Sequence, residues 1–106
     1  MSNSELEEII RVCKALSDPT RFRIFLLLAR RTLCVNAIAS FLNVSQPAVS
    51  QHLRILREAG LVKAKKRGYW VHYTADEEKI NEFLKGFLKT LQGERMRWVK
   101  NAQKRM

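Results

Sequence analysis

Apolar side chains recur with a helical spacing over most of this chain. Runs in which they return every three or four residues predict amphipathic helices. Four such helices are expected in the first 60 residues, over about 5–16, 19–30, 36–42 and 45–60. A fifth is expected over 76–92. Gly86 and Gly93 weaken this last pattern, which resumes toward Ala102, so a continuation of the helix over residues 93–106 is left open.

Beyond the fourth helix the period changes from 3.6 to 2. Residues 61–65 alternate, and residues 69–74 are rich in aromatic and β-branched side chains, which predicts two short strands. Lys66-Arg67-Gly68 between them predicts the turn of a hairpin, with Val71 and Tyr73 on its buried side. We therefore predict a fold that is mainly α with a small β-hairpin, in the order α-α-α-α-β-β-α.

The fourth helix has a defined start and a defined end. Ser45 is a good N-cap, because its hydroxyl accepts from a backbone N–H of the first turn. Pro47 falls in that turn, where its missing N–H costs little. Gly60 falls where a residue with a left-handed backbone ends a helix. The apolar residues between these marks share the side that faces a core, and they are Val49, Leu53 and Leu56.

A second stripe on this helix is polar. Its members are short and polar or long and basic, so they are suited to a base edge or a phosphate. They are Gln46, Pro47, Ser50, Gln51 and Arg54, with Ser45 at the cap and His52 beside them. We predict that this face contacts DNA, the alternative being the solvated side of an ordinary helix. For His52, a brace for the turn and a packed or solvated ring remain open as well.

The third and fourth helices are separated by the tight turn Asn43-Val44. Two short helices joined in this way predict a helix-turn-helix over about 36–60. The hairpin over about 61–74 then has the place of a wing. The basic residues near its tip are expected to reach phosphates or the minor groove, and they are Lys65, Lys66 and Arg67.

The charge balance favours an anionic partner. The 106 residues carry a net charge of +10, from 20 Lys and Arg against 10 Asp and Glu. Residues 45–75 alone hold six basic side chains and one acidic one. Arg21, near the start of the second helix, is a further expected phosphate contact. No apolar run approaches the roughly 20 residues of a membrane span, and no signal peptide is visible. We therefore expect one cytoplasmic domain that binds double-stranded DNA and no membrane.

Five segments in order carry a family resemblance. They are residues 15–24 (ALSDPTRFRI), 33–36 (LCVN), 45–53 (SQPAVSQHL), 56–62 (LREAGLV) and 68–73 (GYWVHY). Together they resemble the ArsR/SmtB family of winged helix-turn-helix repressors, over nearly the whole chain. Each segment is moderately specific, and five in the right order are strong.

The resemblance implies a homodimer through the first and last helices, over about 5–16 and 76–100. The apolar stripes of these helices exceed what one small domain needs, although they would also serve a monomer core. The expected interface residues are Leu6, Ile9, Ile10, Phe83, Phe87 and Leu91. The resemblance also implies that the dimer represses transcription from an inverted repeat and leaves it when an effector binds.

The metal sites that the resemblance suggests lack ligands here. The site at the third helix uses Cys-x-Cys, but this chain has Cys34 followed by Asn36 in the second place, and an amide is a poor ligand for a soft ion. The site on the last helix needs His, and that helix has neither His nor Cys. The only histidines are His52 and His72. We therefore expect no metal and no cofactor.

The two cysteines do not make a disulfide framework. Cys34, beside Arg30 and Arg31, is a candidate thiol sensor, because positive charge favours the reactive thiolate. Cys13 is expected to be a small core residue of the first helix. A thiol-responsive repressor and an architectural DNA-binding protein without an effector remain alternatives. No catalytic triad, phosphate loop or carboxylate pair predicts an enzyme.

Overall fold

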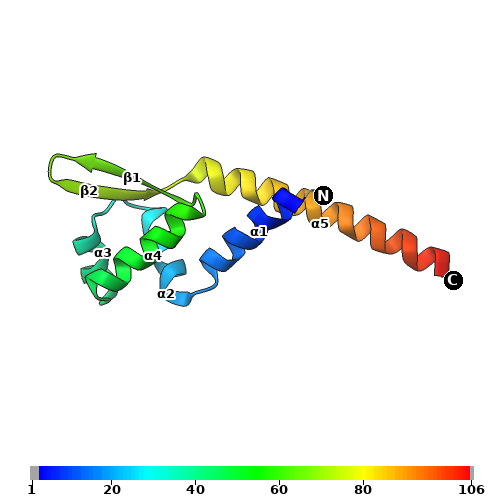
Figure 1. Cartoon of the computed structure of the whole chain (residues 1–106), viewed down its shortest axis with the longest axis horizontal. Helices are drawn as coiled ribbons and strands as arrows, with labels where there is room; N and C mark the ends of the chain where they lie inside the picture. Colours follow the sequence, from blue (N-terminus) through cyan, green and yellow to red (C-terminus); the bar gives the residue numbers. More distant parts are fainter. Residues whose placement is uncertain (1–2, 106) are drawn as a thin grey trace.

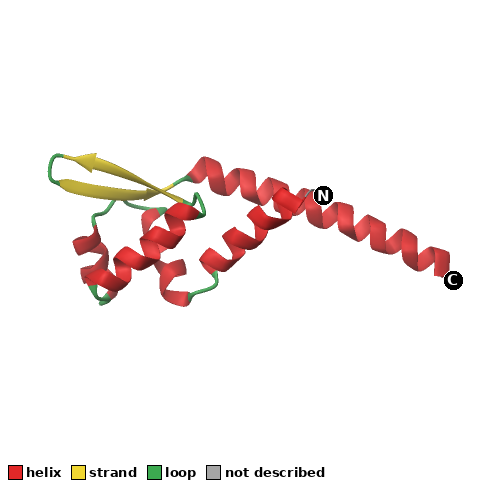
Figure 2. Cartoon of the chain, viewed as in Figure 1, coloured by secondary structure: helices red, strands yellow, loops and turns green. Residues whose placement is uncertain are grey.

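The computed structural model describes the backbone of residues 3–105 and the side chains of residues 4–93. Within them the chain forms five helices and one two-stranded antiparallel sheet, in the predicted order (Figures 1 and 2). The elements are α1 (Asn3–Leu16), α2 (Pro19–Leu28), α3 (Val35–Leu42), α4 (Gln46–Glu58), β1 (Val62–Arg67), β2 (Trp70–Ala75) and α5 (Glu77–Arg105). The architecture is a winged helix-turn-helix.

The first four helices enclose one apolar core. Each of them places at least one side chain there that is at most 1% exposed, and these include Val12, Ile24, Leu28, Ile38, Leu53 and Leu56. The base of the hairpin closes the core with Leu61, Val62 and Ala75. Because α4 contributes Val49, Leu53 and Leu56 to this core, its opposite side is fixed toward the outside.

Local signals set the ends of the helices around the turn. The hydroxyl of Ser45 accepts from the N–H of Ala48 at 3.3 Å, so the predicted N-cap of α4 is confirmed. Asn43, which ends α3, has a φ of 51°, and Gly60, which follows α4, has a φ of 78°. Asparagine and glycine adopt this left-handed conformation at the lowest cost. The second helix ends at Leu28, two residues before the predicted end.

The hairpin turns later than predicted. Arg67 pairs with Trp70, so the tip is the two-residue turn Gly68-Tyr69, and Lys66 and Arg67 belong to β1. The φ of Gly68 is 62°, which a two-residue hairpin turn with glycine in first place requires. The predicted connector at Leu33 also pairs with β2, through both backbone hydrogen bonds to Tyr73.

The structure corrects one further prediction and decides one open question. Val71 is 36% exposed and not buried, because the hairpin extends beyond the body at that point, whereas Tyr73 nearer its base is partly buried. The continuation of the last helix beyond residue 92, which the sequence left open, is decided by the structure, because α5 runs unbroken to Arg105. Its far half projects from the body, which makes the molecule 63 Å long (Figure 1). No described helix is long and apolar enough to cross a bilayer.

Candidate nucleic-acid interface

The outer side of α4 is a continuous polar face. Its members are all exposed, and they are Ser45, Gln46, Pro47, Ser50, Gln51 and Arg54. The buried side of the same helix fixes their direction, since Val49, Leu53 and Leu56 are all at most 1% exposed. The two faces deduced from the helical period are therefore present, and the contact of the outer face with DNA stays a prediction.

A hollow of 340 Å³ adjoins this polar face. It lies between α4 and β2 and is lined by Ser50, Arg54, Arg57 and Tyr73 among others. Arg57 was not among the predicted DNA contacts, although it follows Arg54 by three residues and therefore shares its side of the helix. Glu58 lines the hollow as well, so its two guanidinium groups outnumber one carboxylate.

The pairing of the strands sorts the basic residues of the wing onto two faces. Directly paired residues share a face, and successive residues along a strand alternate between faces. Lys63, Lys65 and Arg67 therefore form one row, opposite Thr74, His72 and Trp70. Lys66 lies on the other face, opposite Val71. The predicted group of Lys65, Lys66 and Arg67 is thus divided between the two faces. Lys63, which was not among the predicted residues, lies in the same row as Lys65 and Arg67.

The tip of the wing is aromatic as well as basic. Tyr69 is fully exposed in the turn, and Trp70 next to it is 56% exposed. Exposed aromatic rings at such a place supply apolar contact area beside the charges of Arg67 and Lys65. The period-2 pattern alone had assigned Tyr69 to a strand.

Arg21 has an internal role that the sequence did not indicate. Its Nε donates to the carbonyl of Ala15 at 2.5 Å, and its Nη2 donates to the carbonyl of Lys14 at 3.2 Å. Its Nη1 lies 3.1 Å from Nδ1 of His52. The guanidinium group has five N–H bonds, so this arrangement leaves two for any phosphate. A DNA contact by Arg21 stays a prediction, but the side chain already links three helices.

His52 packs against two residues at the start of α2. Its side chain is 18% exposed, and the ring lies between Arg21 and Asp18, with Nε2 3.9 Å from the Asp18 carboxylate. That carboxylate also caps α2, accepting from the N–H of Arg21 at 2.9 Å. This backbone hydrogen bond lowers the pKa of Asp18, against a smaller opposing effect of desolvation and with help from the positive charge of Arg21. The ring of His52 is thus packed beside α2, while its contact with DNA and a brace for the turn stay predictions.

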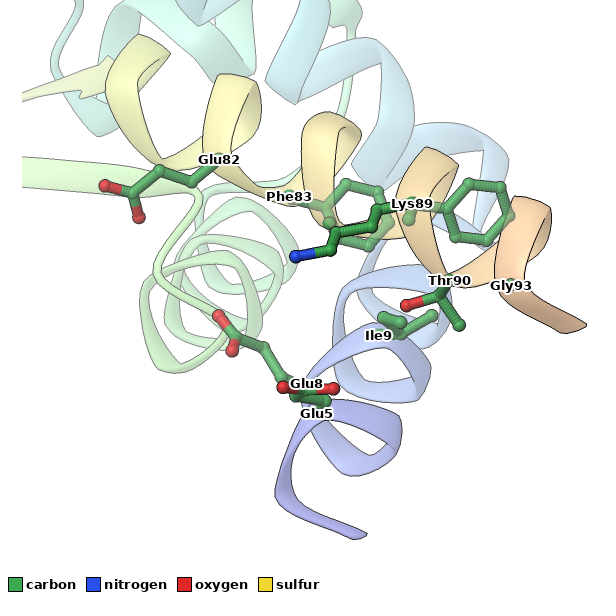
Figure 3. A pocket seen from close by; sticks show the side chains of 10 residues that line it. Glu5, Glu8, Ile9, Glu82, Phe83, Lys89, Thr90 and Gly93 are labelled. Carbon is green, nitrogen blue, oxygen red and sulfur yellow. The ribbon is translucent and has the colours of Figure 1, made fainter. Parts of the chain in front are cut away.

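The predicted interface residues lie on α1 and α5. Leu6, Ile10, Phe87 and Leu91 are between 40% and 54% exposed. Ile9 and Phe83 are partly buried, and with Phe87 they line a groove of 610 Å³ between the two helices (Figure 3). Carboxylates of Glu5, Glu8 and Glu82 stand at its rim (Figure 3).

Cys13 lies outside the core, so its predicted burial is wrong. The core of α1 is formed by Val12 and Ala15, which are at most 1% exposed. Cys13 is exposed on the side of Leu6 and Ile10, which precede it by seven and three residues. The helix therefore has two adjacent apolar stripes, and the monomer buries only one of them.

An ion pair joins α1 to α5 next to the groove. Nζ of Lys79 lies 2.5 Å from the carboxylate of Glu8. This hydrogen bond raises the pKa of Lys79, opposed by partial desolvation and aided by the charges of Glu8, Glu82 and Asp76. The pair fixes the base of α5 against the N-terminal helix.

Cys34 occupies the N-cap position of α3 and is partly buried. Its side chain makes no capping hydrogen bond. Arg31, which was expected beside it, has its guanidinium carbon 5.8 Å from the centre of the Phe41 ring. Among the described residues, no three His, Cys, Asp or Glu side chains are grouped as metal ligands.

Comparison of the sequence with known proteins identifies relatives. Residues 18–64 match the model of the family described as bacterial regulatory protein, arsR family. An uncharacterised helix-turn-helix-type transcriptional regulator of Methanocaldococcus jannaschii is 41% identical over 80 residues, which cover 74% of this chain and 90% of the relative. The arsenic resistance transcriptional regulator ArsR1 of Pseudomonas putida is 38% identical over 89 residues, covering 83% and 69%. The transcriptional repressor SdpR of Bacillus subtilis is 32% identical over 77 residues, covering 73% and 86%.

Solved structures agree with these relatives. An ArsR-like transcriptional regulator from Rhodococcus sp. RHA1 superposes with a TM-score of 0.81 at 30% identity, covering 93% of this chain and 92% of the other. The homodimeric winged helix-turn-helix DNA-binding domain Mb0332 from Mycobacterium bovis gives a TM-score of 0.70 at 28% identity, covering 89% of each chain.

Proposed function

The chain belongs to the arsR family of bacterial regulatory proteins, and from this premise we propose that it is a dimeric repressor that binds an inverted-repeat operator. Members of this family are DNA-binding transcriptional regulators and not enzymes. In the proposed complex the outer face of α4 enters the major groove, and the row Lys63, Lys65 and Arg67 lies on phosphates. The observation that carries the proposal is the uncovered polar face of α4, held outward by three buried residues of the same helix.

Direct readout requires side chains that reach base edges. Gln51 and Arg54 are the strongest candidates, because an amide pairs with adenine and a guanidinium with guanine in bidentate fashion. Both are exposed and three residues apart, so they lie on one side of α4. Gln46 and Ser50 border them on the same face and are suited to bases or phosphates.

The dimer is proposed through the uncovered apolar residues of α1 and α5. Exposed leucines continue along α5 beyond the body, with Leu84 at 53%, Leu88 at 55% and Leu91 at 54%. Apolar patches of this kind on a small domain mark an interface, and a second copy of the same chain covers them symmetrically. The homodimeric Mycobacterium bovis domain has the same fold and supports this arrangement.

We propose that the protein is not released from its operator by a soft metal ion bound at the start of α3. A thiolate at Cys34 has an amide, Asn36, where a second sulfur ligand would be needed. The Pseudomonas putida relative is an arsenic resistance transcriptional regulator. Adding arsenite to the operator complex tests whether this chain responds to the same element. We expect no release by arsenite. Release that Cys34→Ser abolishes would instead restore a sensing role for this cysteine.

The central test selects an operator with the purified protein from random duplexes and measures its affinity by fluorescence anisotropy. A repressor prefers the selected palindrome over random DNA by roughly 10³-fold or more. Gln51→Ala and Arg54→Ala are each expected to cost on the order of 1–3 kcal/mol at the selected site. Arg30→Ala is the matched control, because it removes the same charge from an exposed place outside α4.

Two results would contradict the proposal. Equal affinity for every duplex, with one salt dependence, would make the protein an architectural DNA-binding protein. Equal losses in Arg54→Ala and Arg30→Ala would show that Arg54 contributes only charge.

A further inference from the structure

Arg21 is the meeting point of three helices. It belongs to α2, it binds two backbone carbonyls of α1, and it contacts His52 on α4. The contact with His52 spans 31 positions of sequence. A single side chain therefore connects a helix of the proposed dimer interface with the helix of the proposed DNA face.

The contact on α1 is made with the end of that helix. The last four carbonyls of a helix lack partners within it and carry the negative end of the helix dipole. α1 ends at Leu16, so the carbonyls of Lys14 and Ala15 belong to this group. The guanidinium of Arg21 donates to both, and the carbonyl of Lys14 also accepts from the N–H and the hydroxyl of Ser17. These contacts tie the end of α1 to the start of α2.

The contact on α4 is directional as well. A guanidinium group only donates, so Nδ1 of His52 must accept and the ring proton is assigned to Nε2. Nε2–H then faces the Asp18 carboxylate at 3.9 Å, which is too long for a direct hydrogen bond. Asp18 in turn accepts from the backbone N–H of Arg21. The ring of His52 therefore lies between Asp18, which caps α2, and Arg21, whose backbone N–H donates to that cap.

We propose that Arg21 is a positioning residue, which fixes the angle of α4 relative to α1 and thereby the distance between the two recognition helices of the dimer. This inference rests on the proposed dimeric repressor. In such a dimer the partner's recognition helix is reached only through the interface helices, so a link from α1 to α4 sets the preferred spacing of the two half-sites.

The test varies the number of base pairs between the half-sites of the selected operator. Arg21→Met is compared with Arg23→Met, because Arg23 is exposed on the same helix and both variants lose one charge and gain the same side chain. We expect Arg21→Met to bind the optimal spacing about tenfold more weakly than Arg23→Met and to discriminate less between spacings. Affinity for random duplexes is expected to fall equally in both. A spacing preference as sharp in Arg21→Met as in Arg23→Met would overturn the inference.

His52 provides a second test that leaves the contacts of Arg21 with α1 intact. His52→Ala is expected to flatten the spacing preference, and His52→Gln to restore part of it, because the amide oxygen of Gln is again an acceptor. Removal of a base-contacting group would instead lower affinity at every spacing and keep the preference. If Arg21→Met does not fold by circular dichroism, this pair decides the question, and an unchanged preference in His52→Ala overturns the inference.

The wild-type protein separates this inference from the proposed function. Wild-type protein without a preferred palindrome would overturn both. A wild-type spacing preference that Arg21→Met and His52→Ala retain would overturn only the positioning role of Arg21.

Discussion

The surface of α4 and the wing and the surface of α1 and α5 are both left uncovered by the single chain, but with opposite chemistry. The first is polar and basic, with Gln51, Arg54 and the row of Lys63, Lys65 and Arg67. The second is apolar, with leucines on α5 that are more than half exposed. A polyanion such as DNA binds the first surface, because its counterions are released and gain entropy. The second surface is stabilised by burial against another apolar surface. The difference indicates which partner each surface needs.

The largest effect is expected from breaking the apolar surface. Phe87→Glu places a charge on a residue that is 40% exposed in the groove between α1 and α5, so the dimer would have to bury that charge. We expect a monomer by sedimentation and a loss of operator affinity of roughly a hundredfold or more, since each half-site then binds alone. Leu26→Glu is the control, because Leu26 on α2 is 49% exposed outside this surface. A dimeric Phe87→Glu protein would place the interface elsewhere.

The second prediction compares the basic residues on the two faces of the wing. Replacing Lys63, Lys65 and Arg67 by Ala is expected to weaken binding to all duplexes. It should also reduce the salt slope of log K by about 0.9 for each phosphate that is no longer neutralised. Lys66→Ala, on the other face of the hairpin, is expected to change the slope little. Anisotropy titrations at several salt concentrations measure both. A larger effect of Lys66→Ala would assign the other face of the wing to DNA.

The third prediction concerns the loss of folding stability in acid through Asp18, which lies beside His52 of α4. The backbone N–H of Arg21 holds the pKa of Asp18 below its ordinary value of 3.8. The folded state is therefore stabilised by this carboxylate above the ordinary value, and the contribution disappears as the pH falls through the lowered pKa. Asp18→Asn keeps an acceptor that does not titrate, so its urea midpoint should fall less in acid than that of the wild type. Equal acid dependence of both proteins would exclude Asp18 as the titrating group.

The smallest effect is expected at alkaline pH on the other side of the molecule. The hydrogen bond to Glu8 raises the pKa of Lys79 above its ordinary value of 10.5. Its stabilising effect is complete below that ordinary value and is lost as the pH rises through the raised one. The pair is partly exposed, so its contribution is less than about 1 kcal/mol. Glu8→Gln should remove this alkaline dependence from the urea midpoint, and a dependence that persists would come from another group.

Sequence reasoning succeeded where a few neighbouring residues decide the structure. The N-cap of Ser45 and the stop at Gly60 act over three or four residues, so they are visible in the order of the chain. The polar face of α4 followed from the same local information, because a helical period together with one buried side fixes the other side. Its assignment to DNA stays a prediction that the variants of Gln51 and Arg54 test.

Tertiary structure alone decided the features that depend on residues far apart in the sequence or on a choice between similar apolar stripes. The apolar residues of α1 form two adjacent stripes, and only packing against α2 and α4 decided that Val12 and Ala15 are buried while Cys13 is not. The contact of Arg21 with His52 joins residues 31 positions apart, and no local pattern encodes such a pair. The grouping of Arg67 with Lys63 and Lys65 depends on how far β1 extends, because the sequence pattern placed Lys66 and Arg67 in the turn. Pairing of Arg67 with Trp70 continues the strand and its alternation of faces through these two residues.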